Sequence, residues 1–311
     1  MTFYMNDICE NILSSKLYIF ADDIKVVLAF PPAQLNNSVC SLNRDLTMLC
    51  EWSDMWGMKF SSEKSHFMCF GCSVPINSLF LNNAPISQSP HVRDLGFRYS
   101  RSLNFQEQVH YILSRAKQRI GMVHRTLRLR ESKIEVYKTC IRPLFEYCNT
   151  IYSSMNRGDC ILLEKLQRAF TKSVIGFSSP LTYRERCSMP KLEPLWLRRI
   201  QLNLCFFFKI INASHLRLSS NFRFSDQGAY TLRHRRKRVS TFTAKTRLRR
   251  NFFLVKYSSL WNRLPECIRV IPTLSIFSRM LKKFLTIPNL INTLNLQLLP
   301  EDIFNDGVPG F

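Results

Sequence analysis

The chain has 311 residues, of which 46% are hydrophobic and nine are glycine, so it has enough apolar material for a folded core. Its 44 Lys and Arg residues against 22 Asp and Glu give a formal net charge of +22, which favours a polyanionic partner such as nucleic acid. The 11 cysteines form no disulfide framework, and neither a signal peptide nor a membrane-spanning run is evident. These features exclude a secreted disulfide scaffold and a membrane protein. We expect an intracellular protein of the nucleus or the cytoplasm, which is not secreted.

Two adjacent aspartates, Asp22 and Asp23, stand in the run LYIFADDIKVV. Short apolar, β-prone segments flank them, Leu17–Phe20 before and Ile24–Phe30 after, which predicts a β-hairpin with the acids at its tip. Crowded carboxylates repel each other unless a cation accompanies them, and Mg²⁺ takes carboxylate and phosphate oxygens together. Taken alone, the pair is weak evidence, because Asp is common in turns.

A helix and a strand are expected after this hairpin. Apolar residues recur at helical spacing between residues 31 and 57, and Gly57 is placed to end the helix. A turn that contains Lys64 then leads into an apolar strand over His66–Phe70. A second hairpin is expected over Val92–Phe97.

The chain from Phe105 onward is expected to be helical, because apolar residues recur there at intervals of three and four. Pro143 should kink a helix or start a new one. The segments expected to be helical are 105–123, Ile134–Ile151, Asp159–Val174, Leu202–Ile211 and Leu274–Phe284.

The order of these landmarks resembles the C-terminal part of a reverse transcriptase of non-long-terminal-repeat (LINE-type) retrotransposons, of a jockey-like or chicken-repeat-like lineage. In that family an acid pair on a strand-turn-strand precedes a helix ending in Trp and Gly, a Lys-Ser or Lys-Thr turn, a strand ending in Phe-Gly and a Leu-Gly hairpin. Ser61 departs from the family pattern, which often has Asn there. The matching residues are Phe20-Ala21-Asp22-Asp23, Trp52, Trp56, Gly57, Lys64, Ser65, Phe70, Gly71, Leu95, Gly96, Arg142-Pro143, Glu146-Tyr147, Leu163-Glu164, Gln167-Arg168 and Leu260–Pro265. No single motif decides the resemblance, but the ordered series makes chance agreement improbable.

The resemblance implies an α+β fold. A partial reverse-transcriptase palm, built from hairpins, a helix and short strands, would occupy residues 1–103. An all-helical thumb-like region would follow over 104–213. The remaining parts would be a basic linker or nucleic-acid-binding segment over 214–256, a C-terminal helical segment over 257–288 and a tail over 289–311.

The activity implied by the resemblance is RNA-directed DNA polymerisation by two-metal nucleotidyl transfer with Mg²⁺, and the implied partners are an RNA template and a DNA primer. Asp22 and Asp23 would coordinate the metal. Lys64 would protonate or neutralise the leaving pyrophosphate, with a solvated turn lysine as the alternative interpretation. The residues on the nucleotide or primer side would be Phe20, Ala21, Leu95 and Gly96.

The family's fingers and its first palm strand, which carries a metal-binding aspartate, have no counterpart in the sequence. Asp22 and Asp23 alone leave the metal ions under-coordinated, so we expect that the isolated chain does not polymerise DNA. Polymerisation would require a polypeptide that carries the missing palm and fingers. Other acids are not expected to substitute, and Asp45 and Asp54 are expected on the solvated face of their helix.

No acid occurs between Gln227 and Pro265, where basic residues crowd together and aromatic residues lie among them. Such a segment fits binding to a nucleic-acid backbone with stacking on bases, and a disordered basic loop or nuclear-localisation-like run is the alternative. A second function is therefore a non-catalytic nucleic-acid-binding remnant, and a third reading is an open frame with no selected role. The basic residues are Arg233, Arg235, Arg236, Lys237, Arg238, Lys245, Arg247, Arg249 and Arg250.

Overall fold

The computed structural model describes residues 7–8, 12–71, 79–212, 237–286, 289 and 293–294. It divides into two compact units, Met1–Asn104 and Phe105–Phe311, each described below by itself. The division falls one residue beyond the boundary expected between the palm-like and thumb-like regions. The fold mixes helices with short strands, in agreement with the expected α+β class.

The acid pair lies at the tip of an antiparallel hairpin, as the sequence predicts. Strand β1 (Lys16–Phe20) pairs with β2 (Asp23–Val27), and the last pair in the register joins Phe20 to Asp23. The turn therefore has two residues, Ala21 and Asp22, and Ala21 has a φ of 53°, in the left-handed region that non-glycine residues seldom adopt.

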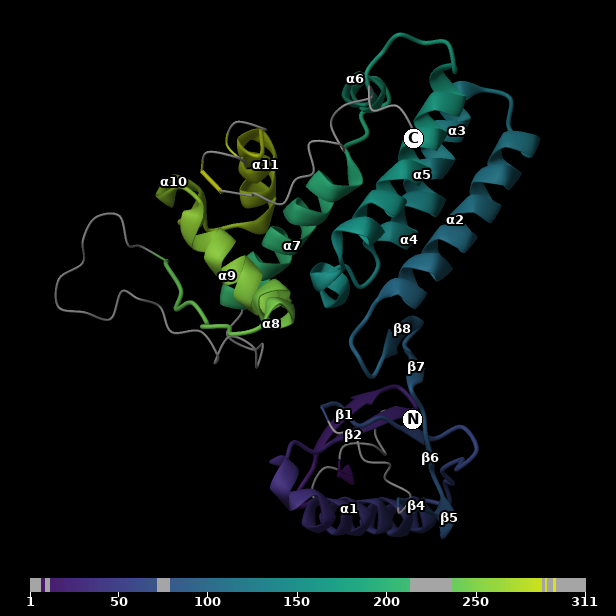
Figure 1. The fold of residues 1–311 in the computed structure, drawn as a ribbon, viewed down its shortest axis with the longest axis vertical. Coiled ribbons are helices and arrows are strands. Elements are labelled where there is room, and N and C mark those ends of the chain that lie inside the picture. The colour runs from purple at the N-terminus through teal and green to yellow at the C-terminus, as the bar shows by residue number, and fades with distance from the viewer. Residues whose placement is uncertain are drawn as a thin grey trace, which may run out of the picture. The chain divides into compact units, whose positions relative to one another are not determined.

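Helix α1 (Leu35–Met55) follows a short 3₁₀ turn, η3 (Pro32–Gln34), and confirms the expected helix. Gly57, at a φ of +66°, lets the chain turn away after the helix ends. Buried Leu46, Leu49 and Trp52 on α1 pack against the inward face of the hairpin, and Figure 1 shows α1 running alongside β1 and β2.

The rest of the N-terminal unit consists of short strand pairs. The strand expected over residues 66–70 is only two residues long, β3 (His66–Phe67), and it pairs in parallel with β6 (Ser87–Gln88). Strands β4 (Phe80–Leu81) and β5 (Ala84–Pro85) form a second pair. The second predicted hairpin is confirmed: β7 (His91–Asp94) pairs with β8 (Phe97–Ser100) across Leu95 and Gly96, whose φ values are 46° and 83°.

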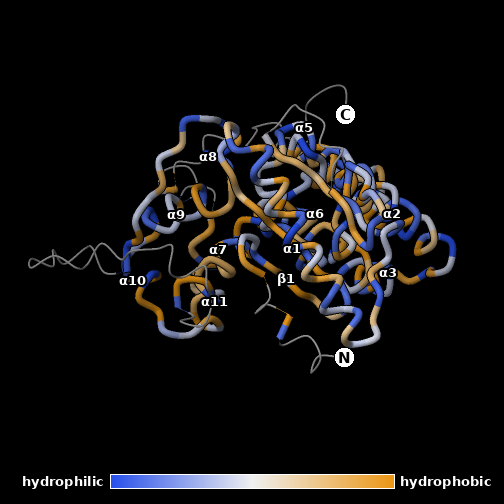
Figure 2. The backbone as a smooth tube through the Cα atoms, turned by 90° about the horizontal axis from the view of Figure 1, so that it is seen from below, coloured by the Kyte–Doolittle hydropathy of each residue, from blue (hydrophilic) through white to orange (hydrophobic). Residues whose placement is uncertain are grey.

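The C-terminal unit begins with helices close to the predicted ranges. Helix α2 (Gln106–Thr126) packs on α5 (Arg157–Ile175), and Figure 2 shows α2 alternating between hydrophilic and hydrophobic residues. Between them the helix expected over 134–151 is divided. It comprises α3 (Arg130–Val136), a π-helical turn η4 (Tyr137–Ile141) and α4 (Arg142–Glu146), and Pro143 stands in the first turn of α4. The predicted effect of Pro143 is therefore confirmed.

The remaining elements are η5 (Ile151–Ser154), α6 (Tyr183–Ser188), α7 (Leu195–Asn212), α8 (Arg247–Asn251), α9 (Phe253–Arg263), α10 (Glu266–Arg269) and α11 (Leu274–Phe284). Helices α7, α9, α10 and α11 all contribute buried residues to one core. Helices α9 and α11 both pack on α7, where Phe207, Phe208, Trp261 and Phe277 are buried together. The helices α9, α10 and α11 of the expected segment 257–288 thus share their core with α7. Figure 1 shows α9 and α11 beside α7. In the part of the chain that the structure describes, no helix is long and apolar enough to cross a membrane.

Candidate functional site: the acid-tipped hairpin and two polar regions of the helical unit

The two faces of the acid-tipped hairpin differ in their surroundings. Leu17, Ile19, Ile24 and Val26 turn inward onto the core of α1. The other face carries large apolar side chains in the open, with Tyr18 56%, Phe20 65% and Val27 46% exposed. A solvated apolar face of this kind is typical of a surface that receives a partner.

Asp22 and Asp23 are both exposed at the tip, next to the exposed Phe20 ring. Adjacent exposed carboxylates can present their oxygens to a hard cation or to solvent, and the neighbouring ring offers an apolar surface. The turn fixes this presentation, because the register pairs Phe20 with Asp23.

An ion pair connects this hairpin to the β7–β8 hairpin. Lys25 Nζ, on the exposed face of β2, lies 2.5 Å from Asp94 Oδ2, the last residue of β7. Leu95 and Gly96 follow directly at the turn, and Leu95 is 39% exposed. The structure therefore joins the strand that begins at Asp23 to the hairpin that carries Leu95 and Gly96.

Lys64 is exposed in the turn after α1. Ser61 organises this turn: its side-chain oxygen accepts from the Lys64 N–H at 3.4 Å, and its carbonyl accepts from Ser65 Oγ at 2.7 Å. No hydrogen bond or ion pair between described residues links Lys64 to Asp22 or Asp23. The geometry therefore favours neither a role at the leaving pyrophosphate nor that of a solvated turn lysine.

Two other acids of the N-terminal unit have structural roles. Asp45 is fully buried, and its carboxylate accepts the backbone N–H groups of Leu13 (3.3 Å), Ser14 (3.3 Å) and Ser15 (2.8 Å). The expectation that Asp45 lies on the solvated face of its helix is wrong, because these three donors occupy it. Asp7 accepts from Trp52 Nε1 at 3.0 Å.

The acid pair has the donor chemistry that suits a hard cation, but within the described residues it has too few ligands to form a metal site. Hard carboxylate oxygens suit Mg²⁺, which takes six ligands in octahedral geometry. Among the residues that the structure describes, no group of three or more His, Cys, Asp or Glu side chains gathers where it could hold a metal ion. The donor chemistry of Asp22 and Asp23 fits Mg²⁺, but two carboxylates alone do not complete its six-ligand coordination.

The helical unit carries a basic surface at α8, which we define by four exposed residues, Lys245, Arg247, Arg249 and Arg250. The Arg249 guanidinium lies over the Phe252 ring at 5.3 Å, and that ring is 43% exposed. Thr246 caps the helix by accepting the Arg249 N–H at 3.2 Å. Cations and an exposed ring on and beside one short helix can contact phosphates and stack on a base.

The other predicted basic residues divide into two groups. Arg233, Arg235 and Arg236 lie outside the described residues. Lys237 and Arg238 lie next to a contact with α9, because Trp261 Nε1 donates to the Lys237 carbonyl at 2.8 Å. The Lys237 side chain also donates to Asn212 Oδ1, at the end of α7, at 3.2 Å.

Asn262 adds to this contact with α9 by exchanging hydrogen bonds of 3.0 Å and 2.8 Å with the backbone of Val239. The sequence did not predict this role for Trp261 and Asn262, although both lie in the segment Leu260–Pro265 that matches the family pattern. These contacts fix where the basic segment enters the fold.

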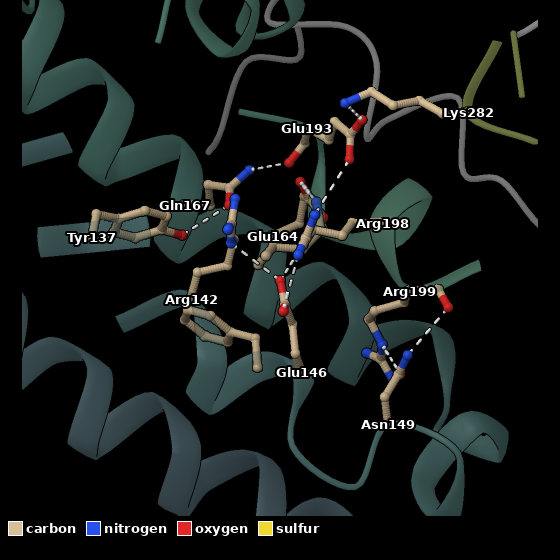
Figure 3. Close-up of polar contacts among 12 residues, drawn as sticks. Tyr137, Arg142, Glu146, Asn149, Glu164, Gln167, Glu193, Arg198, Arg199 and Lys282 are labelled. Carbon is tan, nitrogen blue, oxygen red and sulfur yellow. Dashed lines mark hydrogen bonds and ion pairs between the residues drawn. The ribbon is translucent and has the colours of Figure 1, made fainter. Parts of the chain in front are cut away.

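A buried polar network joins three helices of this unit (Figure 3). Gln167 Oε1 accepts from Tyr137 Oη at 2.8 Å, while Gln167 Nε2 donates to Tyr183 Oη and to the Glu193 carbonyl, both at 2.9 Å. Tyr183 in turn donates to Glu164 Oε1. Glu164 also accepts the backbone N–H groups of Leu195 (3.0 Å) and Trp196 (3.1 Å).

Glu164 lies on α5, and its buried carboxylate accepts hydrogen bonds from the first residues of α7. Burial raises its pKa, while the hydrogen bonds from Tyr183, Leu195 and Trp196 act in the opposite direction. Glu164 and the residues that donate hydrogen bonds to it are all buried, so we interpret the network as structural. The expectation that Leu163–Arg168 serves packing agrees with this burial.

An ion-pair chain lies beside this network. Glu146 accepts from Arg198 and lies 3.2 Å from Arg142 Nε, and Glu193 lies 3.7 Å from Arg198 Nη1 and 2.7 Å from Lys282 Nζ. Figure 3 shows these side chains close together, with dashed lines marking their contacts. Each of the two carboxylates therefore contacts two cations, and Arg198 is shared between them.

Comparison with models of protein families, with curated proteins and with solved structures finds no match for this chain.

Proposed function

We propose that this chain is part of a non-long-terminal-repeat retrotransposon reverse transcriptase, in which the acid-tipped hairpin supplies metal-binding carboxylates and the helical unit binds nucleic acid. The parent reaction is RNA-directed DNA synthesis. The observation that carries the proposal is the joining of the two hairpins by Lys25 and Asp94, because it links the acid pair to the Leu95-Gly96 turn.

Asp22 and Asp23 would hold Mg²⁺, which supplies charge stabilisation at the reacting phosphate when it is bound. The Phe20 ring beside them, which is exposed, would contact a nucleotide or the primer end. The Leu95-Gly96 turn, held by the ion pair, would position the primer strand. Lys64 remains a candidate for neutralising pyrophosphate.

The open edges of the hairpin support a shared active site. In the described residues, β1 and β2 form a sheet of two strands, so each strand has an edge that no other strand pairs with. Such an edge is a template for a further strand. A strand that added there and carried another carboxylate would supply ligands that the acid pair lacks. We therefore propose that the chain by itself does not extend a primer.

A second candidate function is nucleic-acid binding without catalysis. It is favoured by the exposed cations of the α8 surface and by the Phe252 ring next to them, which need no metal ion to act. Under this alternative the acid pair has no part in binding.

The divalent-cation dependence of template–primer binding separates the two functions. Affinity of the full chain for an RNA–DNA template–primer would be measured by fluorescence anisotropy at constant ionic strength, with and without Mg²⁺. Without Mg²⁺ the acid pair repels phosphates, so Asp22→Asn with Asp23→Asn should tighten binding. With Mg²⁺ the unsubstituted chain should gain affinity relative to this double variant.

Asp54→Asn is the matched control, because Asp54 is an exposed acid on α1 of the same unit. It should respond to Mg²⁺ as the unsubstituted chain does. An equal Mg²⁺ response in all three proteins would refute a metal role for the acid pair and favour the second function.

A further inference from the structure

Helix α11 has one side in the core and another exposed to solvent. Phe277 and Leu281 are fully buried, whereas Ile276 and Met280 on the same helix are 44% and 41% exposed. Residues three and four apart on a helix are neighbours, so several exposed residues of α11 gather on one face. We call it the α11 face and define it by four residues: Ile276, Arg279, Met280 and Lys283.

The two cations of the α11 face have no partner among the described residues. Neighbouring Lys282 differs, because its Nζ lies 2.7 Å from Glu193 Oε1 (Figure 3). Between described residues, no hydrogen bond or ion pair involves the side chain of Arg279 or Lys283. Two exposed apolar side chains flanked by two such cations form a surface that suits an acidic segment with apolar residues of its own.

The C-terminal segment 295–311, which lies outside the described residues, has the complementary composition. We call it the acidic segment. Ile303 and Phe304 are apolar, and acids stand on both sides of them. Every charged residue between 284 and 311 is an acid: Glu301, Asp302 and Asp306. On a chain with a formal net charge of +22, such a segment is attracted to exposed cations of the same molecule.

The described residues place the start of the acidic segment beside the end of α11. Phe284 is the last residue of α11, and its carbonyl accepts from Asn289 Nδ2 at 2.8 Å. The Asn289 carbonyl in turn accepts the Leu294 N–H at 3.0 Å. Leu294 is fully buried in the same core as α11, and its carbonyl accepts from Arg263 Nη1 at 2.6 Å. The residue that precedes the segment is therefore fixed.

The acidic segment is long enough to reach the α11 face. Glu301 follows Leu294 by seven residues, which span at most about 25 Å when fully extended. The α11 face is about 10 Å long, because Ile276 and Lys283 are seven residues apart on a helix that rises about 1.5 Å per residue. The acids can therefore meet the cations of the face while Leu294 stays in the core.

We propose that the acidic segment folds back on the α11 face, so that its acids contact Arg279 and Lys283 and its apolar residues contact Ile276 and Met280. The inference is independent of the proposed function. It makes the segment an intramolecular competitor that withholds two cations of the helical unit from other anions, nucleic acid included. The more ordinary interpretation is that the segment stays in solvent and that the exposed side chains of α11 are common surface residues.

Carbodiimide crosslinking of the full chain tests the contact. The reagent joins a lysine amine to a carboxylate that touches it, and mass spectrometry of the monomeric product identifies the pair. Lys282 with Glu193 is the positive control, since the two groups are 2.7 Å apart. We expect Lys283 to be linked to an acid of the segment several-fold more often than exposed Lys245 of the α8 surface. Equal linkage of the segment to both lysines would contradict docking on α11.

A matched variant separates docking from mere proximity along the chain. Ile276→Ser with Met280→Ser removes the apolar half of the face at exposed positions, where substitutions have little effect on stability. Linkage of Lys283 to the segment should fall several-fold in this variant, while the control linkage of Lys282 to Glu193 stays unchanged. The proposal is overturned by equal Lys283 linkage in both proteins, or by Lys283 linkage that occurs only in a dimeric product.

A second measurement reports on the face itself. The methyl group of Met280 would be isotope-labelled and observed by NMR in the unsubstituted chain and in a variant that neutralises the acids, Glu301→Gln, Asp302→Asn and Asp306→Asn. Neutralisation should release the segment and shift the Met280 signal, whereas Met122, which is 53% exposed on α2, should keep its signal. A Met280 signal that is the same in both proteins would show that no docked segment covers it.

Discussion

Lys25 Nζ lies 2.5 Å from Asp94 Oδ2, and this ion pair joins β2 of the acid-tipped hairpin to the end of β7. Both side chains are partly exposed, at 40% and 22%. Solvent therefore screens the pair, and we expect it to fix the positions of the two hairpins more than to stabilise the fold. In the proposed function, this contact keeps the acid pair close to the Leu95-Gly96 turn.

The strength of this ion pair can be measured by a double-mutant cycle of Lys25→Met and Asp94→Asn. We expect a coupling free energy of about 0.2–1 kcal/mol from urea unfolding, because partly exposed pairs fall in this range. A coupling of zero would show that the contact does not hold the hairpins together.

Replacing Asp45 should destabilise the N-terminal unit. Asp45→Ala removes the acceptor of three backbone N–H groups that precede β1, and we expect a loss of about 1–3 kcal/mol in the free energy of unfolding. Asp54→Ala, at an exposed position of the same helix, should change stability by no more than about 0.5 kcal/mol. Equal effects of the two substitutions would contradict the role assigned to Asp45.

Glu164 should make the stability of the helical unit depend on pH. Its pKa in the folded state is raised, chiefly by burial, so the folded state holds this proton more firmly than the unfolded state does. The contribution of Glu164 is therefore fully present below its unfolded pKa and is lost as the pH rises through the folded pKa.

Glu164→Gln removes this titration and keeps one acceptor oxygen. Its stability relative to the unsubstituted chain should therefore increase as the pH rises from about 4, the unfolded value for a glutamate, toward 7. Urea unfolding at a series of pH values would measure this difference. A difference that stays constant, or that decreases with pH, would show that Glu164 does not titrate as its burial implies.

The α8 surface should account for part of the nucleic-acid affinity. Replacing Arg247, Arg249 and Arg250 together by Gln should reduce the salt slope for a single strand by about 2, because three phosphate contacts are lost at about 0.7 each. A control triple variant removes the same charge at exposed Lys172, Arg184 and Lys191, on or near α5 and α6. Anisotropy titrations that gave the same slope for both triple variants would show that only net charge matters.

Local patterns were sufficient to predict several elements. Alternation around Asp22 and Asp23 predicted the hairpin, because strand pairing across a two-residue turn needs only local sequence. Helical spacing predicted α1, α5 and α11 to within a few residues. Pro143 gave the start of α4, because proline lacks the N–H that a continuing helix would use.

Long-range contacts were not predictable in this way. Asp45 stands at a helix position that the sequence pattern predicts to be exposed. Its burial is explained by its contacts with the distant segment Leu13–Ser15. The pairing of Lys25 with Asp94 joins residues far apart in sequence, with no local signal at either one. Arg198 and Arg199 look equivalent in the sequence, yet only the folded structure brings carboxylates to one of them.

The central claim, that Asp22 and Asp23 hold a metal ion at the primer end, is tested most directly by iron-directed cleavage. Fe²⁺ would replace Mg²⁺ in the complex of the full chain with an RNA–DNA template–primer, and hydroxyl radicals would then cut the nucleic acid next to the bound metal. We predict cuts confined to the few nucleotides around the primer 3′ end. They should be lost in the variant with Asp22→Asn and Asp23→Asn and kept in Asp54→Asn. Cleavage that is spread along the duplex, or that persists unchanged in the double variant, would contradict the claim.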